Sequence, residues 1–130
     1  MNRGRFGMVP RVTVSEWLYT FATAVRARDY DAARAGFVDD VRAFGTVVPT
    51  ATSLDQLEVA QWRPVWEVTR DFEFHSICID ERVDRAVVSA LWSSKRVTDD
   101  LLRQGRATIL LQRIGKRWRA THTHFSLEPT

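Results

Sequence analysis

The sequence predicts one α+β domain in which a curved antiparallel sheet packs against three N-terminal helices. Two observations lead to this prediction. Apolar residues recur at helical spacing through the first half of the chain, whereas the half that follows Asp71 consists of segments rich in strand-forming residues. Helices first and a long strand meander second is a pattern typical of the α+β class. Five Trp and seven Phe supply large rings for the core or for the walls of a ligand cavity.

The first helix is expected to begin after Thr13 and to run to Arg28. Thr13-Val14-Ser15-Glu16 is a capping box, in which a hydroxyl and a carboxylate each accept one of the orphan amide hydrogens of the first turn. The apolar stripe of this helix comprises Val14, Trp17, Leu18, Phe21 and Val25. Residues 1–12 have no periodicity, so we expect a flexible arm there, followed by a single domain over residues 13–130.

A second, short helix is expected to begin at Asp29 or Asp31, to carry Phe37 and to end at Asp39-Asp40. A short strand over residues 41–44 should follow it.

The third helix is expected after a loop over residues 45–52, which contains Gly and Pro. Ser53-Leu54-Asp55-Gln56 is a second capping box and marks the start of the helix. Pro64 lies farther along it. Because proline lacks an amide hydrogen and disfavours helix at the preceding residue, we expect a kink or a break at Pro64.

Four long strands are predicted in the second half of the chain. Turn residues, Asp84-Arg85 and Gly115-Lys116, separate the strands of the first pair and of the last pair, as in β-hairpins. The strands are expected over residues 72–79, 86–97, 105–113 and 117–127.

The charge distribution argues against nucleic-acid and membrane partners. The net charge is +3, but the Arg residues are interleaved with Asp and Glu, whereas a nucleic-acid-binding protein gathers its basic residues on one face. No stretch approaches the roughly 20 apolar residues that span a bilayer, and no signal peptide is evident. Cys78 is the single cysteine, so no intrachain disulfide forms. We therefore expect a cytoplasmic protein.

Three local motifs carry a resemblance to a known family. Arg28-Asp29-Tyr30-Asp31 followed by Phe37-Val38-Asp39-Asp40 resembles the helix pair that opens many domains of the nuclear-transport-factor-like fold, and Phe44-Gly45-Thr46 resembles a strand exit in SnoaL-like proteins. The third motif, Trp-x-x-x-His-x-His-x-Ser over residues 118–126, resembles one SnoaL-like branch and the end of the association domain of calcium/calmodulin-dependent kinase II. The resemblance extends over residues 14–127. It implies a cone-shaped α+β fold with a cavity between sheet and helices.

Ketosteroid isomerases share this fold, but the resemblance does not extend to their catalytic groups. It places their carboxylate base at or near Gly45, their tyrosine at or near Phe21 and their aspartic acid donor within residues 105–113. Gly45 has no side chain, Phe21 has no hydroxyl, and residues 105–113 contain no carboxylate. Steroid isomerisation by that mechanism is therefore not expected.

His122 and His124 are the leading candidates for chemistry. In a regular strand, residues two apart point to the same side, and Trp118, Ala120 and Ser126 share that side. The resemblance implies that this side is the concave wall of the cavity. Three interpretations stay open: a ligand pocket, histidines satisfied in a polar core or dimer contact, and a metal site that needs a third ligand such as His75. We expect no metal and no cofactor.

Arg106 and Thr108 share one face of the neighbouring strand. On the concave side, Arg106 would hold an anionic ligand group through its planar guanidinium; otherwise it lies in solvent or pairs with an acid. Trp92 and Trp66 also have two interpretations, an apolar cap over a ligand and ordinary core packing.

Together, these features favour a pocket protein for a small hydrophobic or mixed-polarity molecule. If it is an enzyme, we expect proton transfer, as in isomerisation, cyclisation or hydration, with His122 or His124 as acid or base and Arg106 stabilising negative charge. The expected ligand-binding residues are Trp92, Thr108, Ser126, Trp66 and Trp118.

The alternatives are a non-catalytic ligand-binding protein and an oligomerisation module. The residues of the last strand that point to the opposite, convex side of the sheet would then supply the surface of a homodimer. Its residues are Thr121, Thr123 and Phe125.

Overall fold

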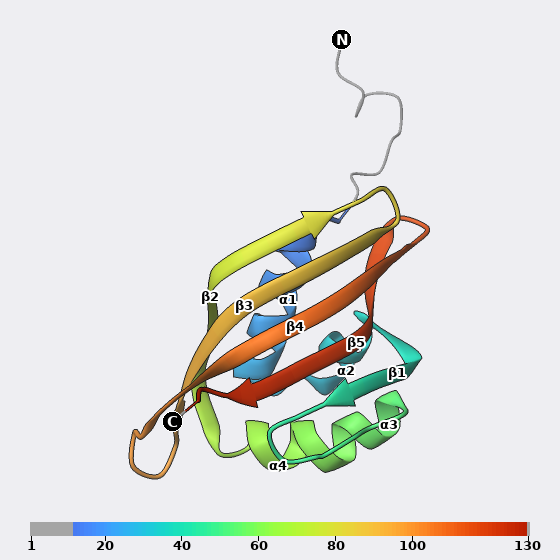
Figure 1. The fold of residues 1–130 in the computed structure, drawn as a ribbon. Helices are drawn as coiled ribbons and strands as arrows, with labels where there is room; N and C mark the ends of the chain where they lie inside the picture. Colours follow the sequence, from blue (N-terminus) through green and yellow to red (C-terminus); the bar gives the residue numbers. More distant parts are fainter. Residues whose placement is uncertain (1–11, 130) are drawn as a thin grey trace.

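The computed structural model describes residues 12–129, with the helices on one side of a curved five-stranded sheet (Figure 1). The strands lie in the order β1-β5-β4-β3-β2. β1 is parallel to β5, and the other neighbouring strands are antiparallel. This arrangement confirms the predicted α+β class. The elements are α1 (Val14–Ala27), α2 (Tyr30–Arg34), β1 (Phe37–Phe44), α3 (Leu54–Leu57), the π-helical segment η2 (Glu58–Trp62), α4 (Arg63–Trp66), β2 (Thr69–Glu81), β3 (Arg85–Arg96), β4 (Leu102–Ile114) and β5 (Arg117–Leu127).

The described helices include none that is long and apolar enough to cross a bilayer. The expected arm over residues 1–12 lies, apart from Val12, outside the described residues.

The N-terminus of α1 forms the predicted capping box. The Thr13 hydroxyl accepts a hydrogen bond from the Glu16 amide at 3.0 Å, and the Glu16 carboxylate accepts one from the Thr13 amide at 3.2 Å. The helix ends at Arg28, whose backbone is left-handed with φ 54°. This cap directs the Arg28 side chain toward the chain that leaves α4, where its guanidinium donates to the carbonyls of Trp66 and Thr69.

The second helix is shorter than predicted. It is capped by Asp29 and ends at Arg34, so Phe37 and Asp39-Asp40 belong to β1 instead. Strand pairing is the reason, because β1 adds to the edge of β5 and Phe37 lies opposite Ala120. The buried Phe37 ring then joins the core, which the local helical pattern did not reveal.

The third helix is continuous, and the expected disruption at Pro64 takes the form of a π-helical segment. Ser53 caps the helix by accepting a hydrogen bond from the Gln56 amide at 3.1 Å. Segment η2 ends at Trp62, immediately before α4 begins, with Pro64 in its first turn. A wider turn before proline accommodates the missing amide hydrogen bond without breaking the helix.

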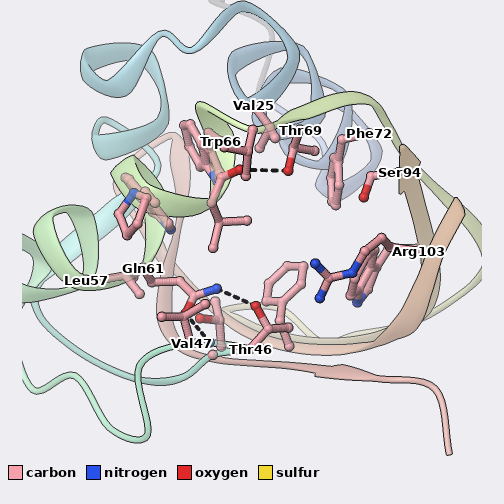
Figure 2. A pocket seen from close by; sticks show the side chains of 18 of the residues that line it. Val25, Thr46, Val47, Leu57, Gln61, Trp66, Thr69, Phe72, Ser94 and Arg103 are labelled. Atoms are coloured by element: carbon pink, nitrogen blue, oxygen red, sulfur yellow. Dashed lines mark hydrogen bonds between the residues drawn. The ribbon is translucent and has the colours of Figure 1, made fainter. Parts of the chain in front are cut away.

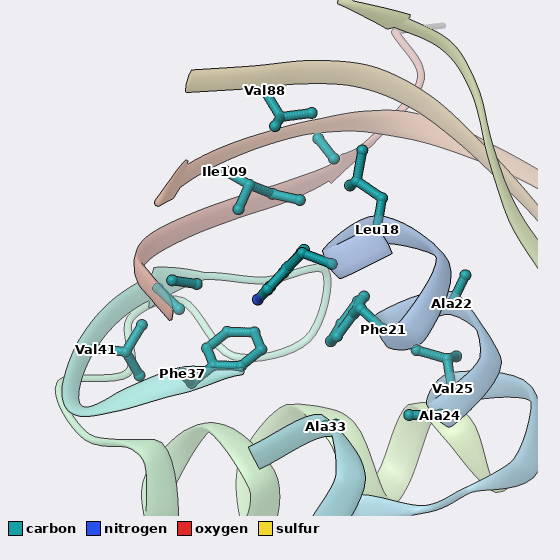
Figure 3. Close-up of a cluster of buried hydrophobic side chains, with 14 of the residues drawn as sticks. Leu18, Phe21, Ala22, Ala24, Val25, Ala33, Phe37, Val41, Val88 and Ile109 are labelled. Atoms are coloured by element: carbon teal, nitrogen blue, oxygen red, sulfur yellow. The ribbon is translucent and has the colours of Figure 1, made fainter. Parts of the chain in front are cut away.

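The core lies between α1 and the inner face of the sheet, the face toward the helices (Figure 3). Phe21 is central to it. Its ring lies within 5.4 to 6.4 Å, centroid to centroid, of the rings of Trp17, Phe37, Trp62, Trp66, Phe72, Phe74 and Phe125.

A β-bulge in β5 reverses the facing predicted for the end of this strand. Leu111 pairs with Ala120 but Leu110 pairs with His122, so Thr121 is an extra residue without a partner on β4. Before the bulge, Ala120 points to the inner face, and after it Thr123 does. Every later residue is therefore on the opposite side from the one that strict alternation predicts.

Candidate functional site

A cavity of about 180 Å³ lies between the inner face of the sheet and the helix formed by α3, η2 and α4 (Figure 2). It is open to solvent at a rim where Val47 and Val68 are exposed. An engineered cavity of about 150 Å³ holds benzene, so this space admits a molecule of one or two rings. Its walls are mostly apolar and include the rings of Phe21, Trp62, Trp66, Phe72, Trp92 and Phe125.

Gln61 and Thr46 form a polar end of the cavity that presents hydrogen-bond donors. The Gln61 side-chain oxygen accepts from the amides of Val47 and Val48, both at 2.8 Å, which sets the orientation of its amide group. Its nitrogen donates to the Thr46 hydroxyl at 2.8 Å. One amide hydrogen of Gln61 and the hydroxyl hydrogen of Thr46 therefore remain for a ligand, within the described residues.

Gly45 makes room for this arrangement. A Cβ atom there would lie 2.4 Å from the Gln61 side-chain oxygen, so any larger residue displaces the amide group. The resemblance placed a catalytic base of ketosteroid isomerases at or near Gly45. In this chain the corresponding space contains the side chain of Gln61, which is not a base at physiological pH.

Trp66 forms a rigid wall of the cavity. Its ring is stacked between those of Trp62 and Tyr30, at 4.9 and 5.2 Å. Burial raises the pKa of the Tyr30 hydroxyl, which has no hydrogen-bond partner within the described residues. Trp66 itself is buried in the core and also lines the cavity, so it has both of the roles considered from the sequence.

Trp92 lies across Gly105, its partner on β4. A Cβ atom at Gly105 would lie 2.4 Å from the Trp92 ring, so glycine is required for this close approach. The indole nitrogen donates to the Arg106 carbonyl at 3.3 Å. Trp92 thus gives the cavity a flat wall on the sheet side.

Arg103 brings a positive charge to the sheet side of the cavity. Figure 2 shows its side chain reaching into the cavity from the side opposite to Gln61 and Leu57. It pairs across the strands with Ser94, a buried residue that also lines the cavity. Among residues 12–129, neither side chain forms an ion pair or a side-chain hydrogen bond with another residue.

The titratable residues of the cavity lining are Lys95, Arg96 and Arg103, and none of the lining residues is acidic. Arg96 is paired with Asp99 in the turn that joins β3 and β4. The hydrogen bond from Arg96 lowers the pKa of Asp99 to about 2, with a further contribution from the Leu101 amide. The Asp99 carboxylate balances the charge of Arg96. The remaining positive charge of the cavity lining therefore comes from Arg103 and Lys95.

The two histidines lie outside the cavity, on the outer face of the sheet, so their predicted concave position is wrong. The bulge at Thr121 is the reason. His122 and His124 flank the Phe44 ring, with centroids at 5.3 and 5.4 Å and nearly perpendicular planes. Arg106, Thr108 and Ser126 are on the same outer face, where Thr108 is opposite His124 and Arg106 is opposite Ser126. The structure thus brings these five residues together outside the cavity lining, although Phe44, which both histidines contact, is itself a lining residue.

Thr123 and Phe125 were predicted to lie on the outer surface. That prediction is wrong, because both residues line the cavity on the inner face. Trp118 is buried at the other end of the core, under the Arg113 guanidinium at 4.3 Å, and does not line this cavity. His75 lies on β2 opposite Leu91 of β3, separated from the other histidines by two strands. In residues 12–129, no three metal-binding side chains come together.

The predicted site residues do not include the polar cavity residues Thr46, Gln61, Ser94 and Arg103. Arg103 has the same strand parity as Gly105, Ala107, Ile109 and Leu111, and this small and apolar row already indicates the inner face of β4. That signal was available from the sequence and also excluded Arg106 from the cavity. Gln61 had no comparable signal, because its position depends on the π-helical turn.

Comparisons with known proteins agree with the fold. A family model described as SnoaL-like domain matches residues 14–129. An NTF2-like protein of unknown function from Pseudomonas putida is 22% identical, with a TM-score of 0.78 over 87% of this chain and 82% of the other. A ketosteroid isomerase-like protein from Erwinia carotovora is 19% identical, with a TM-score of 0.70 over 90% and 95%.

A candidate calcium/calmodulin-dependent protein kinase II association domain from Xanthomonas campestris is 14% identical, with a TM-score of 0.79 over 93% of this chain and 96% of the other. Likenesses at these identities establish the fold alone. No curated protein sequence matches the chain.

Proposed function

Because the chain belongs to the SnoaL-like domain family, we propose that it binds a small, mostly apolar molecule in the cavity between the sheet and the α3–η2–α4 helix. The observation that carries this proposal is the combination of aromatic walls with a few convergent donors, which is typical of ligand sites. Trp92 would pack against a flat ring system, and the edge of the Trp66 ring, whose faces are stacked on Trp62 and Tyr30, would contact it. The donors of Gln61 and Thr46 would orient it by binding an acceptor such as a carbonyl or hydroxyl oxygen.

The chemistry of the lining favours binding over acid–base catalysis. A general base needs an accessible group that is unprotonated near neutral pH, and the lining offers only Lys95, Arg96 and Arg103 as titratable groups. What the cavity supplies is stabilisation of negative charge by fixed donors. Proton transfer by His122 or His124 with Arg106 gains no support from this cavity and stays a prediction. Turnover that survives in a His122→Ala, His124→Ala double variant would contradict it.

Calorimetric titration with 2-naphthamide, a neutral two-ring compound, tests the binding proposal. We expect the protein to bind it and a Ser94→Leu variant, which fills part of the cavity, to bind it about tenfold more weakly. The matched control is Ser93→Leu, because Ser93 is the next residue on β3 and does not line the cavity. Affinity equal in both variants, or no binding by the unmodified protein, would contradict the proposal.

A second candidate function is assembly of a homodimer through the outer face of the sheet. Val87, Leu91 and Leu110 lie on the outer faces of β3 and β4 and are 37 to 41% exposed. Val87 and Leu110 are cross-strand partners and form an exposed apolar pair, with His122 on the other side of Leu110. Such a patch favours a protein partner. A second copy is the occupant that we propose, since the fold is shared with a structure described as an association domain.

A further inference from the structure

The cavity has a second polar end, and its charge distinguishes it from the first. Gln61, in the helix, and Thr46, in the loop after β1, are neutral donors that lie against each other. Arg103 and Ser94 lie on the sheet side, next to each other across β3 and β4. Cross-strand partners have Cβ atoms about 5 Å apart, so one small anionic group can accept hydrogen bonds from both side chains.

The charge at this end is not balanced within the described chain. No carboxylate of residues 12–129 is within 4.0 Å of the Arg103 guanidinium, although Arg34, Arg63, Arg70 and Arg96 all have acidic partners at that distance. The side chain is half-buried and directed into an apolar space (Figure 2). A guanidinium there is partly removed from water, which makes an anionic partner more favourable than at an exposed position.

The spacing along β3 relates this end to the aromatic wall. Trp92 and Ser94 both point to the inner face and are two residues apart, a distance of about 7 Å along a strand. A ring packed against Trp92 therefore has a directly attached carboxylate within reach of Ser94 and Arg103.

From this geometry we infer that the ligand of the cavity is an organic anion, an aromatic or similarly flat molecule with a carboxylate that Arg103 and Ser94 bind. The inference rests on the proposed function and specifies its ligand class. A bidentate guanidinium–carboxylate pair is the recognition expected at this end. Gln61 and Thr46 then serve the opposite end of the same molecule.

The test compares 2-naphthoate with 2-naphthamide, which have the same rings and differ in the charged group. Calorimetric titration should give about tenfold tighter binding for the carboxylate. In Arg103→Met, the carboxylate should bind at least tenfold more weakly while the affinity for the amide stays unchanged. Arg103→Lys should retain part of the preference because the charge remains but the planar fork is lost. The control, Arg85→Met, removes one exposed Arg charge at the far end of β3 and should leave both affinities unchanged.

Each contrary outcome has a distinct meaning. Equal affinity for the two compounds in the unmodified protein, or equal weakening of both in Arg103→Met, would overturn the anionic ligand class while the cavity remains a binding site. Weakening of carboxylate binding to the same extent in Arg85→Met would also overturn it, because net charge would then be the cause. Failure of both compounds to bind would overturn the proposed function together with this inference.

Discussion

The two faces of β4 and β5 differ sharply in composition, although consecutive residues of the same strands supply both. The inner face has small and apolar side chains, Gly105, Ala107 and Ile109 on β4 and Thr123 and Phe125 on β5, and it forms the core and the sheet-side wall of the cavity. The outer face has mostly polar and ring side chains, among them Arg106, Thr108, His122, His124 and Ser126, next to the exposed Leu110. A motif with functional residue types therefore acquires its role only from the face on which it lies. In β5, one extra residue decides that face.

The largest effect on stability is expected from single-residue deletions, which test on which face of the sheet the residues of β4 and β5 lie. Deletion of Thr108, in the regular part of β4, moves one half of that strand to the wrong faces and should abolish cooperative unfolding. Deletion of Thr121 removes the extra residue and leaves Ala120 and Thr123 on the inner face, so this variant should still fold, although less stably. Urea unfolding followed by circular dichroism measures both. Loss of folding in the Thr121 variant alone would contradict the assigned bulge.

The next largest effect is expected from two neighbours on opposite faces. Phe125→Ala removes a ring that packs at 6.1 to 6.5 Å from Phe21, Phe72 and Phe74, so it should lower the free energy of unfolding by about 2–4 kcal/mol. His124→Ala removes an exposed side chain and should change it by about 0.5 kcal/mol or less. Thermal and urea denaturation measure the difference. A larger loss for His124→Ala would mean that the inner and outer faces are reversed.

A smaller effect on stability, but a clear effect on assembly, is expected for Leu110→Lys. This substitution puts a charge into the exposed apolar patch of the outer face, so it should turn a dimer into a monomer. Sedimentation velocity measures the oligomeric state, and Gln112→Lys, which adds the same charge at an exposed polar position of β4, is the control. A dimer that survives Leu110→Lys, or a monomeric unmodified protein, would contradict assembly through this face.

The smallest effect is expected at the turn between β3 and β4. The pKa of Asp99 is lowered to about 2 in the folded protein, so its carboxylate stabilises the fold at pH values above its ordinary pKa, and this contribution is lost as the pH falls from about 4 through 2. Asp99→Asn should lower the urea midpoint slightly at pH 7 and by a smaller amount at pH 2. A difference that is equal at both pH values would assign the effect to packing or to the hydrogen bond with the Leu101 amide instead of charge.

Some of the cavity residues can be predicted from the sequence pattern alone. Trp92 and Trp66 were identified as possible ligand contacts because large rings in a small chain have few places to be buried. Arg103 was within reach of the same reasoning, since it has the parity of the apolar residues of β4. The role of Arg106 as a ligand contact depended on its face of the strand being concave, and this face is the outer one.

Local sequence is enough to predict the α+β class, the capping box at Thr13, the strand over residues 117–127 and the turn at Gly115, because each depends on residues that are close together in the chain. Local sequence does not predict that residues 37–40 form a strand, that Pro64 follows a π-helical turn, or that the two histidines face outward. Each of these depends on pairing or packing with a distant segment. In particular, the bulge at Thr121 is a feature of the pairing of β5 with β4, and no local pattern in β5 predicts it.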